Sequence, residues 1–332
     1  MNVQKINIKT SPLQRVKLNI SPEELFVRIQ KLYNIGTIAS CKVFGKGVIE
    51  VNIKVTTTTG DFVLKIFSEK KYWRVKQLTH FMRSIKSRGV KVQKIVPTLA
   101  GKLYFRIRGE GKYYYACLLS YFHGRDFSTS DPSLEKIIEI AKSLAIINKD
   151  KIEVAPHYDE CLIPNLPHEF KKKAYLIKNK KYKNILFDYS RKISTINFNL
   201  LQNGVIHGDL SREHVLARGK DICLLDFGAL NWDKVVVDLA IAMSWFCMDV
   251  HNFSKEKFWI KYNLFLETYK KYIKLSDYEI KVLPILICAN YAMNYLLGKY
   301  YLEVIGEPHA KYYADFGKRG IDLVDPLIEQ PA

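Results

Sequence analysis

Two short apolar runs near the middle of the chain each lead into an aspartate, and this feature constrains the fold more than any other. The first run, residues 205–206, continues into His207-Gly208-Asp209, and the second, residues 222–225, continues into Asp226-Phe227-Gly228. Short apolar runs bounded by polar turn residues are typical of buried strands. The sequence therefore predicts two strands whose ends each carry one carboxylate, with Asp209 opening a polar loop and Asp226 beginning a turn.

These two carboxylates suit the two tasks of a phosphoryl-transfer site. Phosphoryl transfer needs a carboxylate beside the attacking hydroxyl and separate ligands for the metal ion that neutralises the nucleotide phosphates. Asp209 suits the first task. Asp226 suits the second, with His214 as a further side-chain ligand.

The spacing of these residues resembles that of a known family. A ligand five positions after Asp209 and an aspartate 17 positions after it are similar to the H-G-D-x-x-x-x-N and D-F-G motifs of the aminoglycoside-phosphotransferase and choline-kinase superfamily. Asp238-Leu239-Ala240 is similar to the D-L-A motif that follows in that family. The resemblance extends over residues 45–297 and is most specific over residues 206–240.

The resemblance implies an α+β, protein-kinase-like bilobal fold. Residues 1–121 would form a small N-terminal, nucleotide-binding lobe of antiparallel strands plus one helix. Residues 122–332 would form a larger, mainly helical lobe for catalysis and substrate binding. The same resemblance implies an enzyme that uses Mg²⁺ to transfer the γ-phosphate of ATP or GTP to a hydroxyl group.

The resemblance also implies a role for each motif residue. Asp209 would position the acceptor hydroxyl and can deprotonate it, while His214 and Asp226 would hold Mg²⁺. Other polar residues would support the catalytic loop, namely His207, Ser211 and Asp238.

His214 stands where the family usually has a metal-binding asparagine. Some kinases that modify the 2″-hydroxyl of aminoglycosides carry a similar H-x-D-x-S-x-x-H segment, which Ser211 and His214 fit. Imidazole is a softer ligand than an amide oxygen, and Mg²⁺ prefers oxygen. The substitution therefore leaves the metal preference open.

A hairpin is predicted in the N-terminal part. Apolar residues alternate with polar ones over residues 48–55, and a second strand-like run over residues 62–67 follows a Gly60-Asp61 turn. Lys65 is the one charge in the second run. The pair resembles the hairpin that covers the nucleotide in this superfamily, so Gly45, Gly47 and Lys65 would contact the phosphates.

The partner of Lys65 is left open by the sequence. Related kinases usually pair this lysine with a glutamate on the next helix, but no glutamate lies between residues 70 and 91, and Gln77 stands near the expected place. Lys65 could instead pair with Glu50, with Glu69, or directly with phosphate.

Further elements follow from periodicity. Helices are predicted over residues 72–88, 235–248 and 282–297, and a strand over residues 113–121. Asp131-Pro132 is predicted as the N-cap and first turn of another helix. The hinge between the lobes would read the purine edge through its backbone, at Ser120, Tyr121 and Phe122.

Bulk composition limits the partners and the compartment. The formal charge of +19 favours anionic partners such as a nucleotide. The lysines of residues 171–183 are interpreted as a solvated helix face rather than a nucleic-acid site. Six cysteines without a C-x-x-C pair indicate reduced core residues. No apolar run of membrane-spanning length and no secretion signal are apparent, so we expect a cytoplasmic protein without a membrane partner.

Several acceptors fit the resemblance. The expected substrate is a small hydroxylated compound, either an aminoglycoside-like antibiotic or a metabolite such as homoserine or choline. The hairpin and residues 238–247 also resemble bacterial homoserine kinases. Aminoglycosides are polycations, so acidic residues would have to gather at the cleft of a basic protein. The candidates for this role are Asp249, Glu303 and Glu307.

A second class of function is a catalytically weak, kinase-like binding or spore-coat-type protein. The replaced asparagine and the missing helix glutamate motivate this alternative. The presence of both Asp209 and Asp226 opposes it.

Overall fold

The computed structural model describes residue 18 and residues 20–44, 50–67, 72–108, 112–249 and 251–329. The chain forms two compact units, Met1–His123 and Gly124–Ala332, which are considered in turn. Their roles as a nucleotide-binding lobe and a substrate lobe stay predictions.

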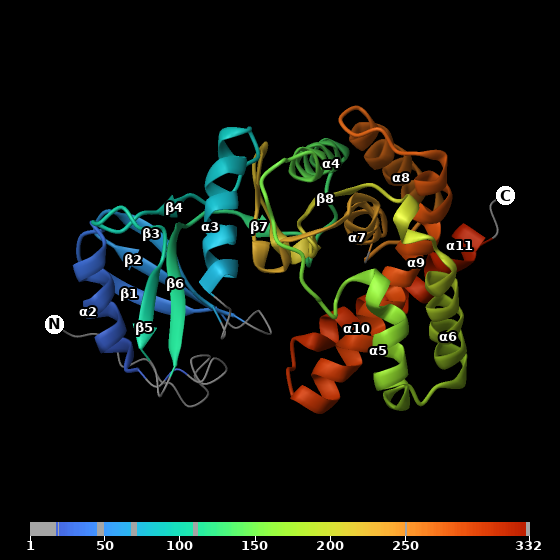
Figure 1. The fold of residues 1–332 in the computed structure, drawn as a ribbon, viewed down its shortest axis with the longest axis horizontal. Helices are drawn as coiled ribbons and strands as arrows, with labels where there is room; N and C mark the ends of the chain where they lie inside the picture. The colour runs from blue at the N-terminus through green and yellow to red at the C-terminus, as the bar shows by residue number, and fades with distance from the viewer. Residues whose placement is uncertain are drawn as a thin grey trace. The chain divides into compact units, whose positions relative to one another are not determined.

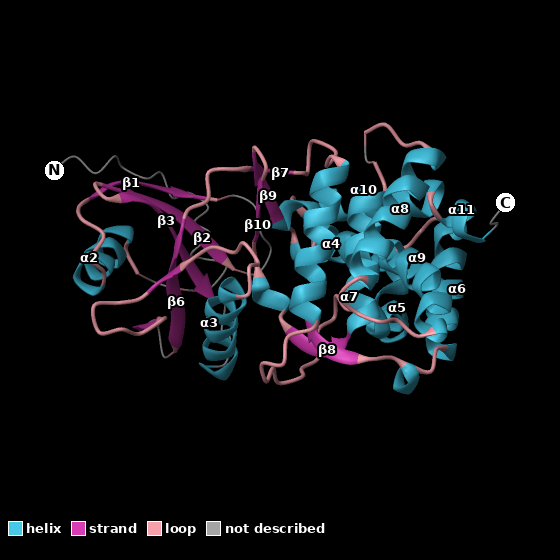
Figure 2. Ribbon diagram, turned by 90° about the horizontal axis from the view of Figure 1, so that it is seen from above, coloured by secondary structure: helices cyan, strands magenta, loops and turns pink. Residues whose placement is uncertain are grey.

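The first unit is built on a six-stranded antiparallel sheet (Figures 1 and 2). The strand order is β1-β2-β3-β6-β4, and β5 also pairs with β6. The strands are β1 (Ile38–Val43), β2 (Val51–Thr57), β3 (Gly60–Phe67), β4 (Ile95–Val96), β5 (Phe105–Arg108) and β6 (Tyr113–Ser120). The predicted hairpin is confirmed as β2 and β3, which join through the pair Thr57 and Gly60.

Two helices lie on opposite sides of this sheet (Figure 1). Helix α3 (Tyr72–Ser87) is the predicted one. Helix α2 (Pro22–Leu32) was not expected, so the prediction of a single helix is wrong. The sequence does contain a signal for the start of α2, namely an N-cap serine followed by a proline in the first turn. The Ser21 side chain accepts from the Glu24 backbone N–H. Its apolar side chains join those of alternate positions on β2, β3 and β6 in one core cluster.

The second unit is mainly helical, with two small antiparallel sheets. Its helices are α4 (Leu134–Asn148), α5 (Leu166–Lys173), α6 (Lys180–Thr195), α7 (Val235–Cys247), α8 (Lys255–Lys270), α9 (Asp277–Tyr300), α10 (Ala310–Leu323) and α11 (Asp325–Glu329). One sheet has the order β10-β9-β7, and the other pairs β11 with β8. These strands are β7 (Arg125–Asp126), β8 (Asn203–Ile206), β9 (Val215–Arg218), β10 (Asp221–Leu224) and β11 (Asn231–Lys234).

Helix α9 forms the centre of this unit. The segment Asp277–Ile305 is long and apolar enough to cross a membrane by length and composition, but 67% of its most apolar window is buried. It packs against α10, α7 and α6, as a core helix does. A Cβ at Gly317 of α10 would lie 2.3 Å from the Tyr295 backbone nitrogen, so glycine permits this close helix contact.

Asp131 does not cap a helix, which corrects the prediction. Helix α4 begins at Leu134 with Ser133 as its N-cap. The Asp131 carboxylate instead accepts from Arg212 Nη2 at 2.8 Å and pairs with Lys261. Arg212 and Lys261 are both buried. Buried cations need a compensating charge, and this requirement determines the partners of Asp131.

The cysteine prediction holds in part. Cys117, Cys223, Cys247 and Cys288 are buried, as expected for core residues, whereas Cys161 is exposed and Cys41 is half-buried. None of the six cysteines, all within described segments, forms a disulfide.

The basic run over residues 171–183 lies at the end of α5 and the start of α6. Six of its seven lysines are exposed, as expected for a solvated face. Lys173 is the exception and corrects the prediction. Its ammonium group is buried, lies 2.9 Å from Glu160 Oε2 and also pairs with Glu169.

Replacement of the exposed lysines in this run by glutamine is expected to leave turnover within a few-fold of wild type. Solvated lysines contribute little to folding or to a remote site. Lys173→Met serves as the contrast, because it leaves the buried Glu169 carboxylate without its cation and should cost about 3 kcal/mol. Turnover and urea unfolding of both variants test this difference. A collapse of turnover at unchanged stability in the glutamine variant would show that the run contacts an anionic substrate.

Candidate active site

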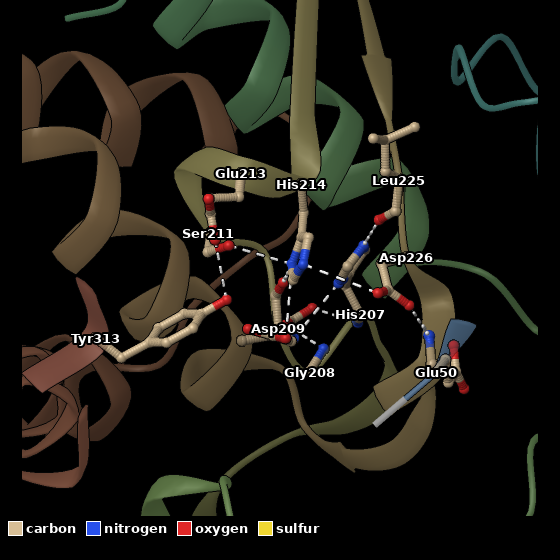
Figure 3. A network of polar contacts seen from close by, with 12 residues as sticks. Glu50, His207, Gly208, Asp209, Ser211, Glu213, His214, Leu225, Asp226 and Tyr313 are labelled. Atoms are coloured by element: carbon tan, nitrogen blue, oxygen red, sulfur yellow. Dashed lines mark hydrogen bonds and ion pairs between the residues drawn. The ribbon is translucent and has the colours of Figure 1, made fainter. Parts of the chain in front are cut away.

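The two predicted strand ends meet in the second unit (Figure 3). Strand β8 leads into the loop that carries Asp209, and strand β10 leads through Leu225 to Asp226. The Leu225 backbone N–H donates to the His214 carbonyl at 2.8 Å. A backbone hydrogen bond therefore connects the two segments that carry Asp209 and Asp226.

Asp238 braces the loop before Asp209. Its carboxylate is fully buried and accepts from the backbone N–H groups of His207 at 2.8 Å and Gly208 at 2.9 Å. Asn148 Nδ2 also donates to it at 2.7 Å. Burial raises the pKa of Asp238 to about 6, although these donors oppose the rise.

Gly208 permits this turn for two reasons. Its φ is +80°, a conformation that favours glycine, and an added Cβ would lie 2.6 Å from the Ala229 carbonyl oxygen. A larger residue would displace the loop that carries Asp209.

His207 joins the two aspartate loops. Its Nε2 lies 2.9 Å from the Leu225 carbonyl oxygen, which can only accept, so Nε2 carries the proton. The ring is fully buried and lies 4.6 Å, between ring centroids, from Phe227. Burial lowers the pKa of His207 to about 4, so this imidazole is neutral.

The hydrogen bonds of His214 determine which of its nitrogens faces Asp226. Nδ1 lies 2.6 Å from the Asp209 carbonyl oxygen and therefore carries a proton, and Ser211 Oγ lies 3.1 Å from the same nitrogen. Nε2 lies 3.9 Å from Asp226 Oδ2. In the neutral ring the lone pair of Nε2 thus faces Asp226. Burial disfavours the protonated ring, but Asp209 and Asp226 outweigh it and raise the pKa of His214.

Asp226 adopts an unusual backbone conformation. Its φ is +53° and ψ is 68°, and it is the only non-glycine residue with positive φ among the described residues. Its Oδ1 accepts from the Gly228 N–H at 3.1 Å. Aspartate tolerates this left-handed region better than most residues, and such strain is common at functional sites.

Asp209 combines an accessible carboxylate with a raised pKa. The side chain is 46% exposed, so an acceptor hydroxyl can reach it. Desolvation by the surrounding protein raises the pKa of Asp209 to about 7, Asp226, Asp159 and Glu213 raise it further, and His214 opposes them.

Glu213 connects this loop to helix α10. Its Oε2 lies 2.6 Å from His309 Nε2 and accepts from the Tyr313 hydroxyl at 3.2 Å. Asp159, Glu213 and Tyr313 were not among the predicted site residues. Glu213 lies only four positions after Asp209, whereas nothing in the sequence shows that the segments of Asp159 and Tyr313 lie near Asp209.

Two of the three acidic residues proposed from the sequence, Asp249 and Glu303, have other partners. Asp249 is buried and accepts from the backbone N–H groups of His251 and Asn252, at 2.8 and 2.9 Å. Glu303 pairs with Lys299. The negative charge that acts on Asp209 comes from Asp226, Asp159 and Glu213 instead.

His214 and Asp226 could together hold a divalent cation whose remaining ligands are phosphate and water oxygens. Among the described residues no group of three or more His, Cys, Asp and Glu side chains could hold a metal ion. His214 Nε2 and Asp226 Oδ2 lie 3.9 Å apart, close enough for both to contact one cation.

The first unit answers the question about the partner of Lys65. Its ammonium group forms an ion pair with the Glu50 carboxylate, and the two side chains are only 7% and 6% exposed. Glu69, Gly45 and Gly47 lie outside the described residues.

Two of the three predicted hinge residues, Ser120 and Tyr121, form backbone hydrogen bonds within the first unit. The Ser120 N–H donates to the Lys94 carbonyl at 2.8 Å, and the Tyr121 N–H donates to the Asp61 carbonyl at 3.1 Å. The Ser120 carbonyl accepts from Gln93 Nε2 at 3.0 Å. Purine recognition by Ser120, Tyr121 and Phe122 stays a prediction.

Similarity to known proteins agrees with the geometry of the two aspartate loops. Residues 40–272 match the profile of the Phosphotransferase enzyme family. The chain belongs to this family. It is therefore a kinase-type phosphotransferase that acts on hydroxyl groups of small molecules, and the predicted activity class is confirmed.

Individual members of this family are distant in sequence. The homoserine kinase of Methylobacillus glycogenes is 26% identical over 228 residues, which cover 66% of this chain and 67% of that enzyme.

Two solved structures confirm the protein-kinase-like fold. The amicoumacin kinase hAmiN, in complex with AMP-PNP, Ca²⁺ and Ami, has a TM-score of 0.68 at 13% identity and covers 90% of this chain and 94% of its own. A microcompartment-associated aminopropanol kinase has a TM-score of 0.67 at 13% identity and covers 89% and 96%.

Proposed function

We propose that this phosphotransferase transfers the γ-phosphate of ATP to the hydroxyl group of a small alcohol that also carries an amine, with homoserine as the first candidate. The observation that carries the proposal is the negative charge around Asp209. We also propose that the reaction takes place in the cytoplasm.

The negative charges around Asp209, where the acceptor hydroxyl would bind, support a cationic substrate. Asp226, Asp159 and Glu213 add to the desolvation that raises the pKa of Asp209. An ammonium group on the acceptor would offset these charges and favour the ionised carboxylate that the reaction needs. The charge around Asp209 is thus negative, although the net charge of the whole chain is +19.

Similar proteins support the same class of acceptor. The relative from Methylobacillus glycogenes is a homoserine kinase, and one of the similar structures is an aminopropanol kinase. Homoserine and aminopropanol both carry an amine and a hydroxyl group. The nucleotide analogue in the amicoumacin kinase complex favours ATP over GTP for this chain.

We assign each site residue one role in this reaction. The Asp209 carboxylate orients the acceptor hydroxyl and accepts its proton as the new oxygen–phosphorus bond forms and the bond to ADP breaks. Lys65 binds nucleotide phosphate through its ammonium group. His214 Nε2 and the Asp226 carboxylate would hold Mg²⁺, which would supply positive charge against the nucleotide phosphates. His207, Ser211 and Asp238 maintain the loop geometry.

A phosphate-transfer screen tests this function. Wild type and Asp209→Asn are incubated with ATP or GTP and with homoserine, aminopropanol, choline, spectinomycin or glycerol, and phosphorylated product is measured by mass spectrometry. We expect ATP-dependent product from an amine-bearing alcohol, most from homoserine, and little from glycerol. Equal turnover of glycerol, or no product from any amine-bearing alcohol, would contradict the proposal.

Lys65→Ala is expected to raise the KM for ATP or lower turnover, and also to lower stability because it leaves the buried Glu50 carboxylate without its cation. The substitution removes the ammonium group that binds phosphate, and a charge-assisted contact is worth about 1.5–3 kcal/mol. Steady-state kinetics together with circular dichroism measure both properties. Unchanged kinetics in a folded variant would remove Lys65 from the site.

His214→Asn is expected to retain activity, whereas His214→Ala should require more metal. Asparagine supplies an oxygen ligand, which Mg²⁺ prefers, while alanine supplies none. The concentrations of Mg²⁺ and Mn²⁺ that give half-maximal turnover provide the measurement, and we expect His214→Asn to shift the preference toward Mg²⁺. Equal metal requirements in the alanine variant and the wild type would exclude His214 as a ligand.

A further inference from the structure

Lys65 is held by a carboxylate from its own hairpin. Its ion pair with Glu50 is almost completely buried. Glu50 directly precedes β2, and Asn52 of β2 is the register partner of Lys65 in β3. The ion pair is therefore local to the hairpin and does not depend on the placement of a helix.

Helix α3 offers no carboxylate for this purpose. None of its 16 residues is acidic, and Gln77 carries only an uncharged amide. Glu50, directly before β2, thus takes the place that related kinases usually give to a helix glutamate.

We propose that Glu50 is a positioning residue that orients Lys65 toward the nucleotide phosphates. A lysine side chain has four flexible carbons and three donor hydrogens, so it loses conformational entropy when it binds phosphate. The pair with Glu50 restricts Lys65 before the nucleotide arrives. This inference rests on the proposed phosphate-binding role of Lys65.

A double-mutant cycle separates positioning from a merely structural role. The affinity of the full-length chain for AMP-PNP with Mg²⁺ is measured by calorimetry for wild type, Glu50→Gln, Lys65→Met and the double variant. Glu23→Gln, on the exposed surface of α2, is the charge-matched control. The double variant removes both charges of the buried pair and should therefore fold even if a single variant is unstable.

We expect the effect of Glu50→Gln to depend on Lys65. In the wild-type background it should weaken AMP-PNP binding about tenfold and raise the KM for ATP, with the KM for the acceptor unchanged. In the Lys65→Met background it should strengthen binding or leave it unchanged, because an unpaired carboxylate beside the triphosphate repels it. Glu23→Gln should bind as wild type does.

Two results would overturn this role of Glu50 while the proposed function stands. One is an unchanged affinity of Glu50→Gln, and the other is an equal loss of affinity in both backgrounds. A wild-type chain that binds no AMP-PNP would instead overturn the proposed function and the role of Glu50 together.

Discussion

Asp209→Asn is expected to lower kcat by ~10² or more, as is typical for the loss of a positioned general base. Asparagine preserves the size of the side chain and much of its hydrogen bonding. It removes the charge that orients the acceptor hydroxyl and accepts its proton. Nucleotide should still bind, because Lys65 and Asp226 are unchanged.

The pH dependence of kcat/KM provides an independent check on Asp209. The pKa of its carboxyl group is raised to about 7 in the free protein. Only the ionised carboxylate accepts a proton, so wild-type kcat/KM should rise with pH through this region and level off above it. The residual activity of Asp209→Asn should lack this acidic limb. A full acidic limb in the variant would assign the titration to another group.

Arg212→Leu is expected to destabilise the protein by about 3–5 kcal/mol, the usual cost of removing one partner of a buried ion pair. Arg212 is 0% exposed and donates to Asp131 and to the backbone carbonyls of Ser130, Trp245 and Met248 at 2.7–2.8 Å. Leucine would leave these acceptors unsatisfied in the interior.

Arg191→Leu is the matched control for this substitution. The Arg191 side chain is 71% exposed and pairs with Asp188 at 3.2 Å on the surface of α6. Exposed pairs contribute about 0–1 kcal/mol. Urea unfolding of both variants measures the difference, and equal stability of the two would contradict the structural role of Arg212.

Both aspartate loops could be predicted from the sequence because their signals are local. The apolar runs before Asp209 and Asp226 are short strands, and the residues between them have a fixed spacing that few folds share. The hairpin of β2 and β3 was predictable for the same reason, since alternation and a glycine turn occur within a few residues.

Long-range contacts could not be predicted in this way. Asp131 looked like a helix cap until the structure showed its contact with buried Arg212, 81 residues away. Lys173 looked solvated, although it is buried against Glu160 and Glu169.

The partner of Lys65 illustrates a different limit. Glu50 was one of three alternatives, because a sequence does not show which carboxylate a lysine reaches. The ion pair in the hairpin decides among them.

The most direct test of the proposed mechanism compares AMP-PNP binding by Asp209→Asn and Asp226→Asn across a Mg²⁺ series by calorimetry. Asp209→Asn should bind the nucleotide with nearly wild-type affinity and the same metal dependence, because only the acceptor side changes. Asp226→Asn should bind weakly and require a higher Mg²⁺ concentration, because a charged ligand is lost. Equal, metal-independent losses in the two variants, or wild-type turnover in both, would contradict the assignment of Asp209 and Asp226 to separate tasks.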